Sequence, residues 1–380
     1  MSETHFDVAV IGGGIVGAAT SYTLARSGQH VLLLDQYQPG HTNGSSHGDG
    51  RIVRFNYPEA IYVEMARLAY EAWPQLEAEA GRTLVQRTGL WECAASDNPI
   101  LDELERNFQH YNIPYERLTA IQSNRRFPQL KLGENSEAIY QPDGMVAYAT
   151  LAVQTYWQLA AAHGAQTRSD ARVIAIEPLA DGRIQLRTAD ATYTAEKIVL
   201  AAGGWAKKLL AALGIDLPLR ITQEHIAYFL PAKGSPSHRI GHMPNVIDRH
   251  PSPPEHIFYA LPHTEVAGVK AGFHGTGPEI DPDARPDKDM TRFAPVSQWI
   301  SQRFPHLSPT PTNALTCLYT ITPDEHFILD RHPQHPQIII GAGFSGHGFK
   351  FGPVLGQILA ALVQDTTPPL PLETFSLSRF

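Results

Sequence analysis

The hydrophobic and polar positions near the start of the chain predict a strand, a helix and a second strand. Residues 6–11 are largely apolar and rich in β-branched side chains, residues 18–27 have helical character, and residues 30–34 are apolar again. Short apolar runs of this kind are typical of parallel strands that are covered on both faces. This order predicts the opening unit of a doubly wound sheet.

Three glycines with the spacing G-x-G-x-x-G, Gly12, Gly14 and Gly17, separate the first predicted strand from the helix. Such glycines allow a tight turn, a close approach of backbone to a pyrophosphate and tight helix packing. The helix N-terminus offers N–H groups to the phosphates. Asp35 ends the second strand, where it is placed to accept hydrogen bonds from a ribose diol. An acid there would repel a 2′-phosphate, so the motif favours FAD or NAD over NADP.

The rest of the chain first continues the alternation of predicted strands and helices, and a later segment departs from it. Helical patterns cover residues 61–80, parts of 99–131 with a break at 112–114, 150–163 and 353–362; strand patterns cover 172–177, 183–188, 192–200 and 338–343. Residues 220–317 are instead rich in Pro and His, with strand-like patches at 223–230, 257–261 and 268–273. We therefore predict an α/β protein, in which a Rossmann-like nucleotide-binding domain carries an inserted antiparallel-sheet (α+β) substrate domain.

The predicted domains are discontinuous. The nucleotide-binding domain is expected to comprise residues 1–85, 145–219 and 318–380, and the substrate domain residues 86–144 and 220–317. A length of 380 residues is long for one core, which agrees with two domains.

Composition narrows the classes of partner. The formal net charge of −8 argues against nucleic acid, and no apolar stretch reaches the length of a membrane span. The first strand begins almost at Met1, which leaves no room for a signal peptide, and two cysteines are too few for a disulfide framework. We expect a cytoplasmic protein. The 18 histidines show no metal-binding spacing on a helix face, so no metal site is predicted.

Three further segments carry a resemblance that covers essentially the whole chain. They are GSSHGDGRIVR at 44–54, TCLYTITPDEHFILD at 316–330 and GAGFSGHGFKFGP at 341–353. With the glycine motif, their order and spacing resemble the monomeric sarcosine oxidase family, which includes N-methyltryptophan oxidase. The resemblance implies a two-domain monomer with covalently bound FAD. It also implies oxidation of secondary amines of amino acids, with molecular oxygen reduced to hydrogen peroxide.

The resemblance assigns the covalent attachment to Cys317. In the family, a cysteine in a C-x-Y-T context forms a thioether to the 8-methyl carbon of FAD, and residues 317–320 match. The chemistry needs a thiolate. Cys93 lacks this context and is interpreted as a buried, inert thiol.

Two cations match the family positions that bind the substrate carboxylate: Lys350 of G-H-G-F-K and Arg54, the second arginine of R-I-V-R. The planar guanidinium of arginine grips a carboxylate through two hydrogen bonds. Gly346 and Gly348 are expected to let their loop approach the flavin. The helix that begins near Pro353 is expected to point its positive end at the flavin C2 carbonyl. The alternative for both cations is a solvated surface charge.

Further residues are placed near the flavin and the amine by the resemblance alone. Lys270, in a G-x-K context, would face flavin N5 and assist oxygen reduction, with Arg51 and His47 beside the ring. Without the resemblance, Lys270 would be interpreted as a sheet-edge lysine and His47 as part of a solvated loop. Four residues match positions near the bound amine, or else are ordinary core or surface residues: Tyr259, His274, Tyr319 and His347. We name no general base, because a cationic, aromatic pocket favours the neutral amine.

Two other functions stay open on the sequence. One is an FAD-dependent amino-acid dehydrogenase that passes electrons to a carrier, and the other is a non-catalytic dinucleotide-binding protein. Lys270 argues against the dehydrogenase, and Cys317 argues against the non-catalytic protein. The substrate side chain is not readable from the residues.

Overall fold

The computed structural model describes residues 5–249 and 257–380, so small parts of the predicted segments 1–85 and 220–317 lie outside it. Its first sheet is doubly wound, with the parallel order β9-β2-β1-β12-β19. β18 joins β19 in antiparallel fashion, β11 pairs antiparallel with the first half of β12, and β10 pairs antiparallel with β11. The strands are β1 (His5–Ile11), β2 (Val31–Leu34), β9 (Gln166–Arg168), β10 (Ala175–Pro178), β11 (Ile184–Arg187), β12 (Thr192–Leu200), β18 (Ile328–Arg331) and β19 (Ile338–Ala342).

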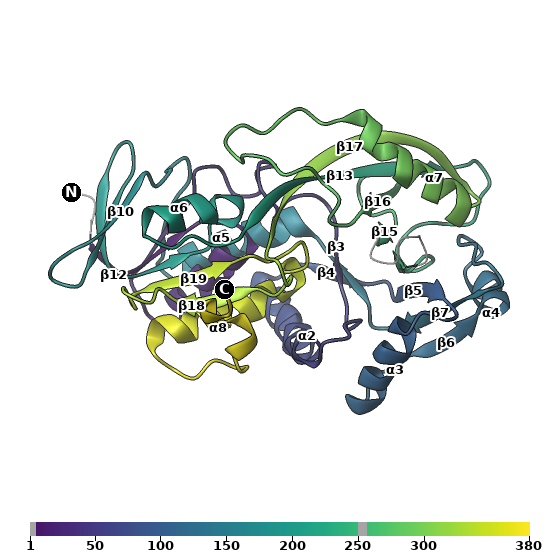
Figure 1. The fold of residues 1–380 in the computed structure, drawn as a ribbon, viewed down its shortest axis with the longest axis horizontal. Coiled ribbons are helices and arrows are strands. Elements are labelled where there is room, and N and C mark those ends of the chain that lie inside the picture. The colour runs from purple at the N-terminus through teal and green to yellow at the C-terminus, as the bar shows by residue number, and fades with distance from the viewer. Residues whose placement is uncertain (1–4, 250–256) are drawn as a thin grey trace.

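Helices cover the first sheet and bury its apolar strands. α1 (Ile15–Arg26) packs between α5 (Ala149–Ala162) and α8 (Gly352–Gln364), and α2 (Ala60–Ala80) packs against α8. In Figure 1 this part of the molecule forms the left half, with α8 and α2 below the sheet. The first two strands are fully or almost fully buried from Val8 to Ile11 and from Val31 to Leu34. Burial on both faces explains why these strands read as continuous apolar runs.

The second sheet forms the right half and has the order β17-β13-β16-β15-β14-β5-β7-β6. All its pairs are antiparallel except β14 with β5, which run parallel. The strands are β5 (Leu90–Ala95), β6 (Glu116–Thr119), β7 (Ser136–Gln141), β13 (Arg220–Pro231), β14 (Asn245–Asp248), β15 (Phe258–Leu261), β16 (Val269–Phe273) and β17 (Leu307–Ile321). The sheet thus combines strands from both segments of the predicted substrate domain; the domain boundaries stay a prediction.

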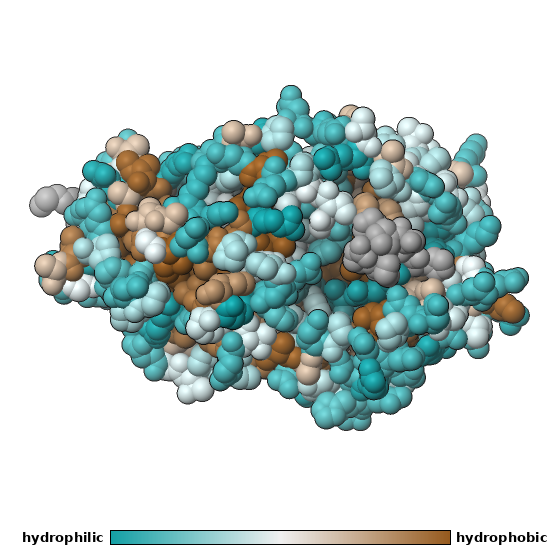
Figure 2. Space-filling view, viewed as in Figure 1, coloured by the Kyte–Doolittle hydropathy of each residue, from teal (hydrophilic) through white to brown (hydrophobic). Residues whose placement is uncertain are grey.

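Smaller elements complete the described chain. A third, antiparallel sheet links β3 (Arg51–Val53), β8 (Met145–Ala147) and β4 (Val85–Arg87). The remaining helices are α3 (Ile100–His110), α4 (Ala120–Arg126), α6 (Ala206–Ala212) and α7 (Ala294–Arg303), with 3-10 turns η1 (Gly203–Trp205), η2 (Met290–Phe293), η3 (Phe349–Phe351), η4 (Glu373–Phe375) and η5 (Leu377–Arg379). Figure 2 shows apolar residues in groups between hydrophilic ones, mostly over the half that carries the first sheet. In the described ranges, no helix is long and apolar enough to cross a membrane.

The predicted fold class is confirmed, but some local predictions are wrong. α1 begins at Ile15 rather than at residue 18, because Gly14 acts as its N-cap and Gly17 lies inside its first turn. Residues 116–119 form a strand inside a stretch predicted as helix. β17 is a 15-residue strand despite Pro309 and Pro311. It lies at the edge of its sheet, where a proline breaks no hydrogen bond to a second neighbour.

Candidate active site

The glycine motif forms a turn that only glycine fits. At Gly12 the backbone has φ +100°, and an added Cβ would lie 2.4 Å from Ala201 O. A Cβ on Gly17 would lie 1.8 Å from Gly12 O, because the helix packs directly on the turn. A Cβ on Gly13 would lie 2.2 Å from the Trp157 ring, whose Nε1 donates to Gly13 O at 2.8 Å. The turn therefore leaves an open cradle in front of α1, as binding of a pyrophosphate requires.

Asp35 supports this turn from the end of β2. Its two carboxylate oxygens accept hydrogen bonds from Gly13 N (2.6 Å) and Tyr37 N (2.8 Å). Burial raises the pKa of Asp35, while these two N–H groups lower it. The carboxylate also faces the cavity in front of the turn, so its predicted contact with a ribose stays a prediction.

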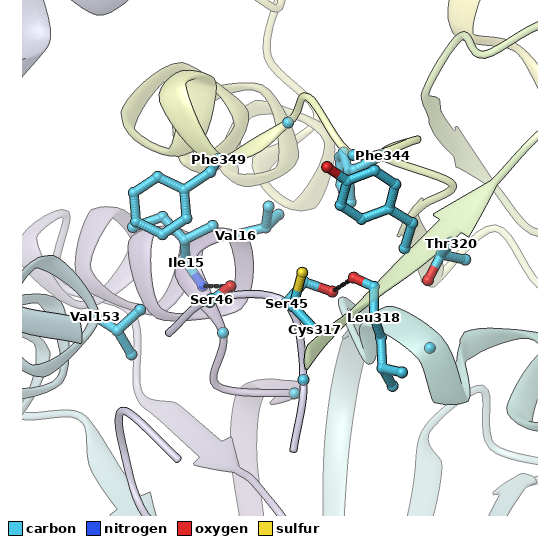
Figure 3. A pocket seen from close by; sticks show the side chains of 18 of the residues that line it. Ile15, Val16, Ser45, Ser46, Val153, Cys317, Leu318, Thr320, Phe344 and Phe349 are labelled. Carbon is cyan, nitrogen blue, oxygen red and sulfur yellow. Dashed lines mark hydrogen bonds between the residues drawn. The ribbon is translucent and has the colours of Figure 1, made fainter. Parts of the chain in front are cut away.

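A long cavity, which we call the central cavity, runs from the glycine turn to the second sheet (Figure 3). Gly17 and His47 do not line it, but the other predicted site residues do: Gly12, Gly14, Asp35, Arg51, Arg54, Tyr259, Lys270, His274, Cys317, Tyr319, Gly346, His347, Gly348 and Lys350. Ser45 and Ser46 hold one wall in place. Ser45 Oγ donates to Leu318 O at 2.5 Å, and Ile15 N donates to Ser46 Oγ at 3.2 Å. Residues more than 300 positions apart, such as Gly12 and Lys350, thus meet in one cavity.

Cys317 lies on β17 and lines this cavity, and only 4% of it is exposed. Burial raises the pKa of its thiol, and the nearby charge of Arg51 lowers it most strongly in return. Cys93 lies on β5 outside the cavity, where its Sγ donates to Asp248 Oδ1 at 3.2 Å. Burial raises the pKa of Cys93 well above its ordinary value. The two thiols therefore differ in that only Cys317 lines the cavity.

Lys270, Arg51 and His47 gather beside Cys317. Lys270 Nζ donates to Gly50 O at 2.7 Å, and Arg51 Nη1 donates to the same oxygen at 2.9 Å. Burial and the Arg51 charge lower the pKa of Lys270 to about 7. Burial and the same cations lower the pKa of His47 to about 3, so this imidazole is neutral. Its Nε2 is buried and has no partner among the described residues.

A second group of cations surrounds Tyr57, which was not predicted as a site residue. Lys350 Nζ donates to Tyr57 Oη (2.7 Å) and to His347 O (2.6 Å). The Arg54 guanidinium lies 4.2 Å above the Tyr57 ring, and its Nη1 is buried without a partner in the described chain. Burial and the Arg54 charge lower the pKa of Lys350 well below its ordinary value. This group is electropositive, and Arg54 Nη1 is its donor without a partner among the described residues.

Tyrosines and neutral histidines fill the space near these cations. His274 Nδ1 lies 3.3 Å from Tyr319 Oη, and Tyr259 neighbours Tyr319. Burial lowers the pKa of His274 to about 4, and it lowers the pKa of His347 well below the ordinary value. Burial raises the pKa of both tyrosines. At neutral pH these four side chains carry no charge, so the cavity here is polar but uncharged apart from its cations.

The loop after β19 closes the cavity. Gly346 has φ +76°, and an added Cβ would lie 2.2 Å from the Tyr319 ring. Gly348 packs against Phe344 with no room for a Cβ. The loop leads through η3 into the N-terminus of α8, and Trp73 Nε1 anchors it by donating to Lys350 O at 2.9 Å. Glycine at both positions lets the loop lie against the cavity wall.

Sequence reasoning missed Gly13, Tyr57, Trp157 and Arg249. Gly13 lies inside the G-x-G-x-x-G motif and was identifiable there, but the other three carry no motif. In the described residues, no group of three His, Cys, Asp or Glu side chains could hold a metal ion.

A glycine turn in front of a helix, opening into a cavity with a cysteine, buried cations and neutral tyrosines, defines a dinucleotide-dependent oxidoreductase. Residues 7–362 match the family model described as FAD dependent oxidoreductase. The chain belongs to this family, whose members related to it include sarcosine oxidases and N-methyl-L-tryptophan oxidases.

Three relatives illustrate the relationship. The chain is 33% identical to monomeric sarcosine oxidase of Bacillus sp. (strain B-0618), with 99% of this chain and 97% of that protein aligned. It is 32% identical to N-methyl-L-tryptophan oxidase of Yersinia pestis, with 99% of each covered. The solved structure of NikD, an amino acid oxidase essential for nikkomycin biosynthesis, superposes with a TM-score of 0.86 at 26% identity, covering 98% and 97%. The predicted family resemblance is confirmed.

The residues present fit FAD. The glycine cradle faces a helix N-terminus for the pyrophosphate, and the same cavity reaches Cys317 and the buried donors of the second sheet. The unpartnered His47 Nε2 and Arg54 Nη1 would gain hydrogen-bond partners from a bound cofactor or substrate.

Proposed function

We propose that this protein oxidises the secondary amine of an N-methyl or cyclic amino acid to an imine, with oxygen reduced to hydrogen peroxide. The observation that carries the proposal is the buried, unpartnered Nη1 of Arg54 beside Lys350, in the cavity that begins at the glycine turn. A carboxylate is the acceptor that satisfies such a donor best. FAD, when bound, supplies the two-electron acceptor for the C–H bond next to nitrogen and passes the electrons to oxygen.

The chain's own residues bind and orient the substrate in this proposal. Arg54 and Lys350 hold the carboxylate, and Tyr57 holds Lys350. The surrounding cations and apolar walls disfavour the charged form of a bound amine, so that its nitrogen keeps the lone pair that oxidation needs. His274 and His347 are neutral near pH 7, so the positive charge that lowers the pKa of a bound amine comes from Arg54 and Lys350.

Lys270 is assigned to oxygen. It is 3% exposed and has one hydrogen-bond partner, Gly50 O, among the described residues. A cation fixed in a dry site stabilises negative charge that develops on oxygen during its reduction. Its pKa of about 7 means that the charge is full only below neutral pH.

Activity is tested with sarcosine, N-methyltryptophan, pipecolate and proline, by measuring peroxide release under air. Peroxide release with a secondary amino acid supports the proposal. Flavin reduction without peroxide release would indicate a dehydrogenase that uses a carrier. An intact yellow protein that no amino acid reduces would favour a non-catalytic dinucleotide-binding protein. Gel filtration tests the proposed monomer, and cell fractionation tests the proposed cytoplasmic location.

We further propose that Cys317 forms the thioether to the flavin. Its place in the cavity and its cationic neighbours support this role, since Arg51 and Lys270 stabilise a thiolate. Cys317→Ala should give protein that loses its yellow colour on acid precipitation. Cys93→Ala is the matched control and should stay yellow, because Cys93 lies outside the cavity. A yellow acid precipitate from Cys317→Ala would refute the attachment site.

A further inference from the structure

The cavity wall formed by the second sheet carries a further cation, Arg249, that the proposed reaction does not use. Arg249 follows directly after β14, and its N–H donates to Cys93 O on β5 at 2.9 Å. Side chains alternate along an extended chain, and Ile247 and Arg249 both line the cavity. Asp248 lies on the opposite face, where Trp299 Nε1 donates to it at 2.7 Å.

The Arg249 guanidinium is held at one edge only. Its Nε donates to Glu92 Oε1 at 2.5 Å, and Glu92 is fully buried. The other carboxylate oxygen, Glu92 Oε2, has no partner among the described residues, so the pair is not bidentate. No residue of the described chain accepts a hydrogen bond from Nη1 or Nη2 of Arg249. With 17% of its side chain exposed, Arg249 keeps this second edge available to the cavity.

Arg249 acts on the same region as the proposed carboxylate anchors. Burial lowers the pKa of His274 most, followed by the charges of Arg54, Lys350 and Arg249. Ile247, on the same strand, adds an apolar side chain to the cavity wall beside Arg249. A guanidinium edge in such surroundings lacks acceptors and gains strongly from one that a ligand brings.

We propose that Arg249 recognises a second carboxylate on the substrate, so that the preferred substrates are acidic N-substituted amino acids. The inference rests on the proposed function: the first carboxylate goes to Arg54 and Lys350, and the second to the Nη edge of Arg249. Glu92 positions Arg249 and balances its charge while the site is without substrate. Arginine suits this task because its planar fork offers two parallel donors.

The alternative is that Arg249 and Glu92 only tie β14 to β5. The chain contains a matched pair for this comparison. Arg303 Nε lies 2.7 Å from Asp248 Oδ2, with side chains 11% and 0% exposed, and Arg303 does not line the cavity. If Arg249 and Glu92 have only a structural role, mutation of Arg249 should have the same effect on substrate preference as mutation of Arg303.

The test measures kcat/KM for N-methyl-L-aspartate and N-methyl-L-alanine in the wild type, Arg249→Met and Arg303→Met. The wild type should prefer the aspartate derivative. Arg249→Met should lose about 10- to 100-fold on N-methyl-L-aspartate, the usual effect of removing a charge-assisted hydrogen bond, and little on N-methyl-L-alanine. Arg303→Met should leave the ratio of the two substrates unchanged. Arg249→Lys keeps the charge and should retain part of the preference.

A binding measurement gives a second readout that needs no turnover. Thiodiacetate and (methylthio)acetate replace the amine nitrogen by sulfur, and their binding is followed by the change in flavin absorbance. Arg249→Met should weaken thiodiacetate binding about 10- to 100-fold and leave (methylthio)acetate binding nearly unchanged. Equal weakening of both ligands, an unchanged ratio in both assays, or a wild-type preference for N-methyl-L-alanine would overturn the inference. So would a selective loss on N-methyltryptophan, which would assign Arg249 to an aromatic ring.

The outcomes separate this inference from the proposed function. Oxidation of N-methyl-L-alanine with no role for Arg249 would reject the inference alone. A protein that oxidises neither these two substrates nor sarcosine, N-methyltryptophan, pipecolate or proline would reject the proposed function, and thiodiacetate binding would still decide the role of Arg249.

Discussion

The nucleotide end and the reaction end of the central cavity differ in whether their buried polar groups already have hydrogen-bond partners. At the nucleotide end, the polar groups of the turn already have partners: both Asp35 oxygens accept backbone N–H groups, and Gly13 O accepts Trp157 Nε1. At the reaction end, Arg54 Nη1 has no described partner, and the lysines Lys270 and Lys350 have lowered pKa values. The nucleotide end therefore has its hydrogen-bond partners without a ligand, whereas the reaction end carries cations that an anion would pair with.

This difference indicates how each end recognises its ligand. The turn binds through its shape, because backbone N–H groups and missing Cβ atoms admit the phosphates. We expect the reaction end to bind through charge, because a buried cation without a partner costs free energy that an anionic ligand offsets. Substitutions at the nucleotide end should therefore abolish function by steric clash. Substitutions at the reaction end should reduce function by graded electrostatic losses.

The largest effect is expected from Gly17→Ala. The new Cβ would meet Gly12 O at 1.8 Å, and neither backbone segment can move without opening the turn. Purified protein should contain essentially no FAD, as measured by flavin absorbance per protein. Gly133→Ala is the control, because nothing lies within 4 Å of the added Cβ. Full FAD content in Gly17→Ala would show that the turn does not bind by shape.

Lys270→Met should slow reoxidation of the reduced flavin about 100- to 1000-fold, the usual loss when a preorganised charge is removed. Reduction by substrate should change little, because methionine keeps the apolar stem. Stopped-flow absorbance separates the two half-reactions. Lys207→Met is the matched control, since Lys207 also donates to a backbone carbonyl (Leu219 O, 2.9 Å) but lies outside the cavity. Slow reduction with normal reoxidation would assign Lys270 to the substrate instead.

Arg54→Ala or Lys350→Ala should lower kcat/KM for an amino-acid substrate about 10- to 100-fold, because each removes a charge-assisted hydrogen bond. A matching amine without the carboxylate should lose far less. The comparison is made in steady-state assays with both substrates. Equal losses on the two substrates would mean that these cations serve the flavin or the fold.

The smallest effect is a pH dependence. Lys270 is charged below its pKa of about 7 and neutral above it, so its help to oxygen is lost as the pH rises. A bound anion would raise this pKa, which places the fall at or above pH 7. Reoxidation by the wild type should slow by up to about tenfold per pH unit in this range, as one titrating proton requires. Lys270→Met should lack this dependence. A wild-type rate that increases with pH would contradict the role of the charge.

The sequence alone determined those features that depend on local patterns. Apolar runs located β1, β2, β12 and β19, since burial on both faces leaves a local signature. The glycine spacing located the nucleotide turn, because a positive φ and missing Cβ atoms are properties of single residues. The family resemblance supplied the remaining site residues, and all of them but His47 line the cavity.

Only the tertiary structure decided how distant segments combine. Tyr57 contacts Lys350 across 293 positions, and no local pattern encodes this contact. The parallel pairing of β14 with β5, which brings Glu92 to Arg249, likewise depends on strand order in the sheet. The lowered pKa values of the buried lysines follow from burial that many elements create together. The periodicity of the sequence indicates which face of a helix or strand a residue occupies. Only the packing of distant elements determines which side chains meet on that face and how far they are removed from water.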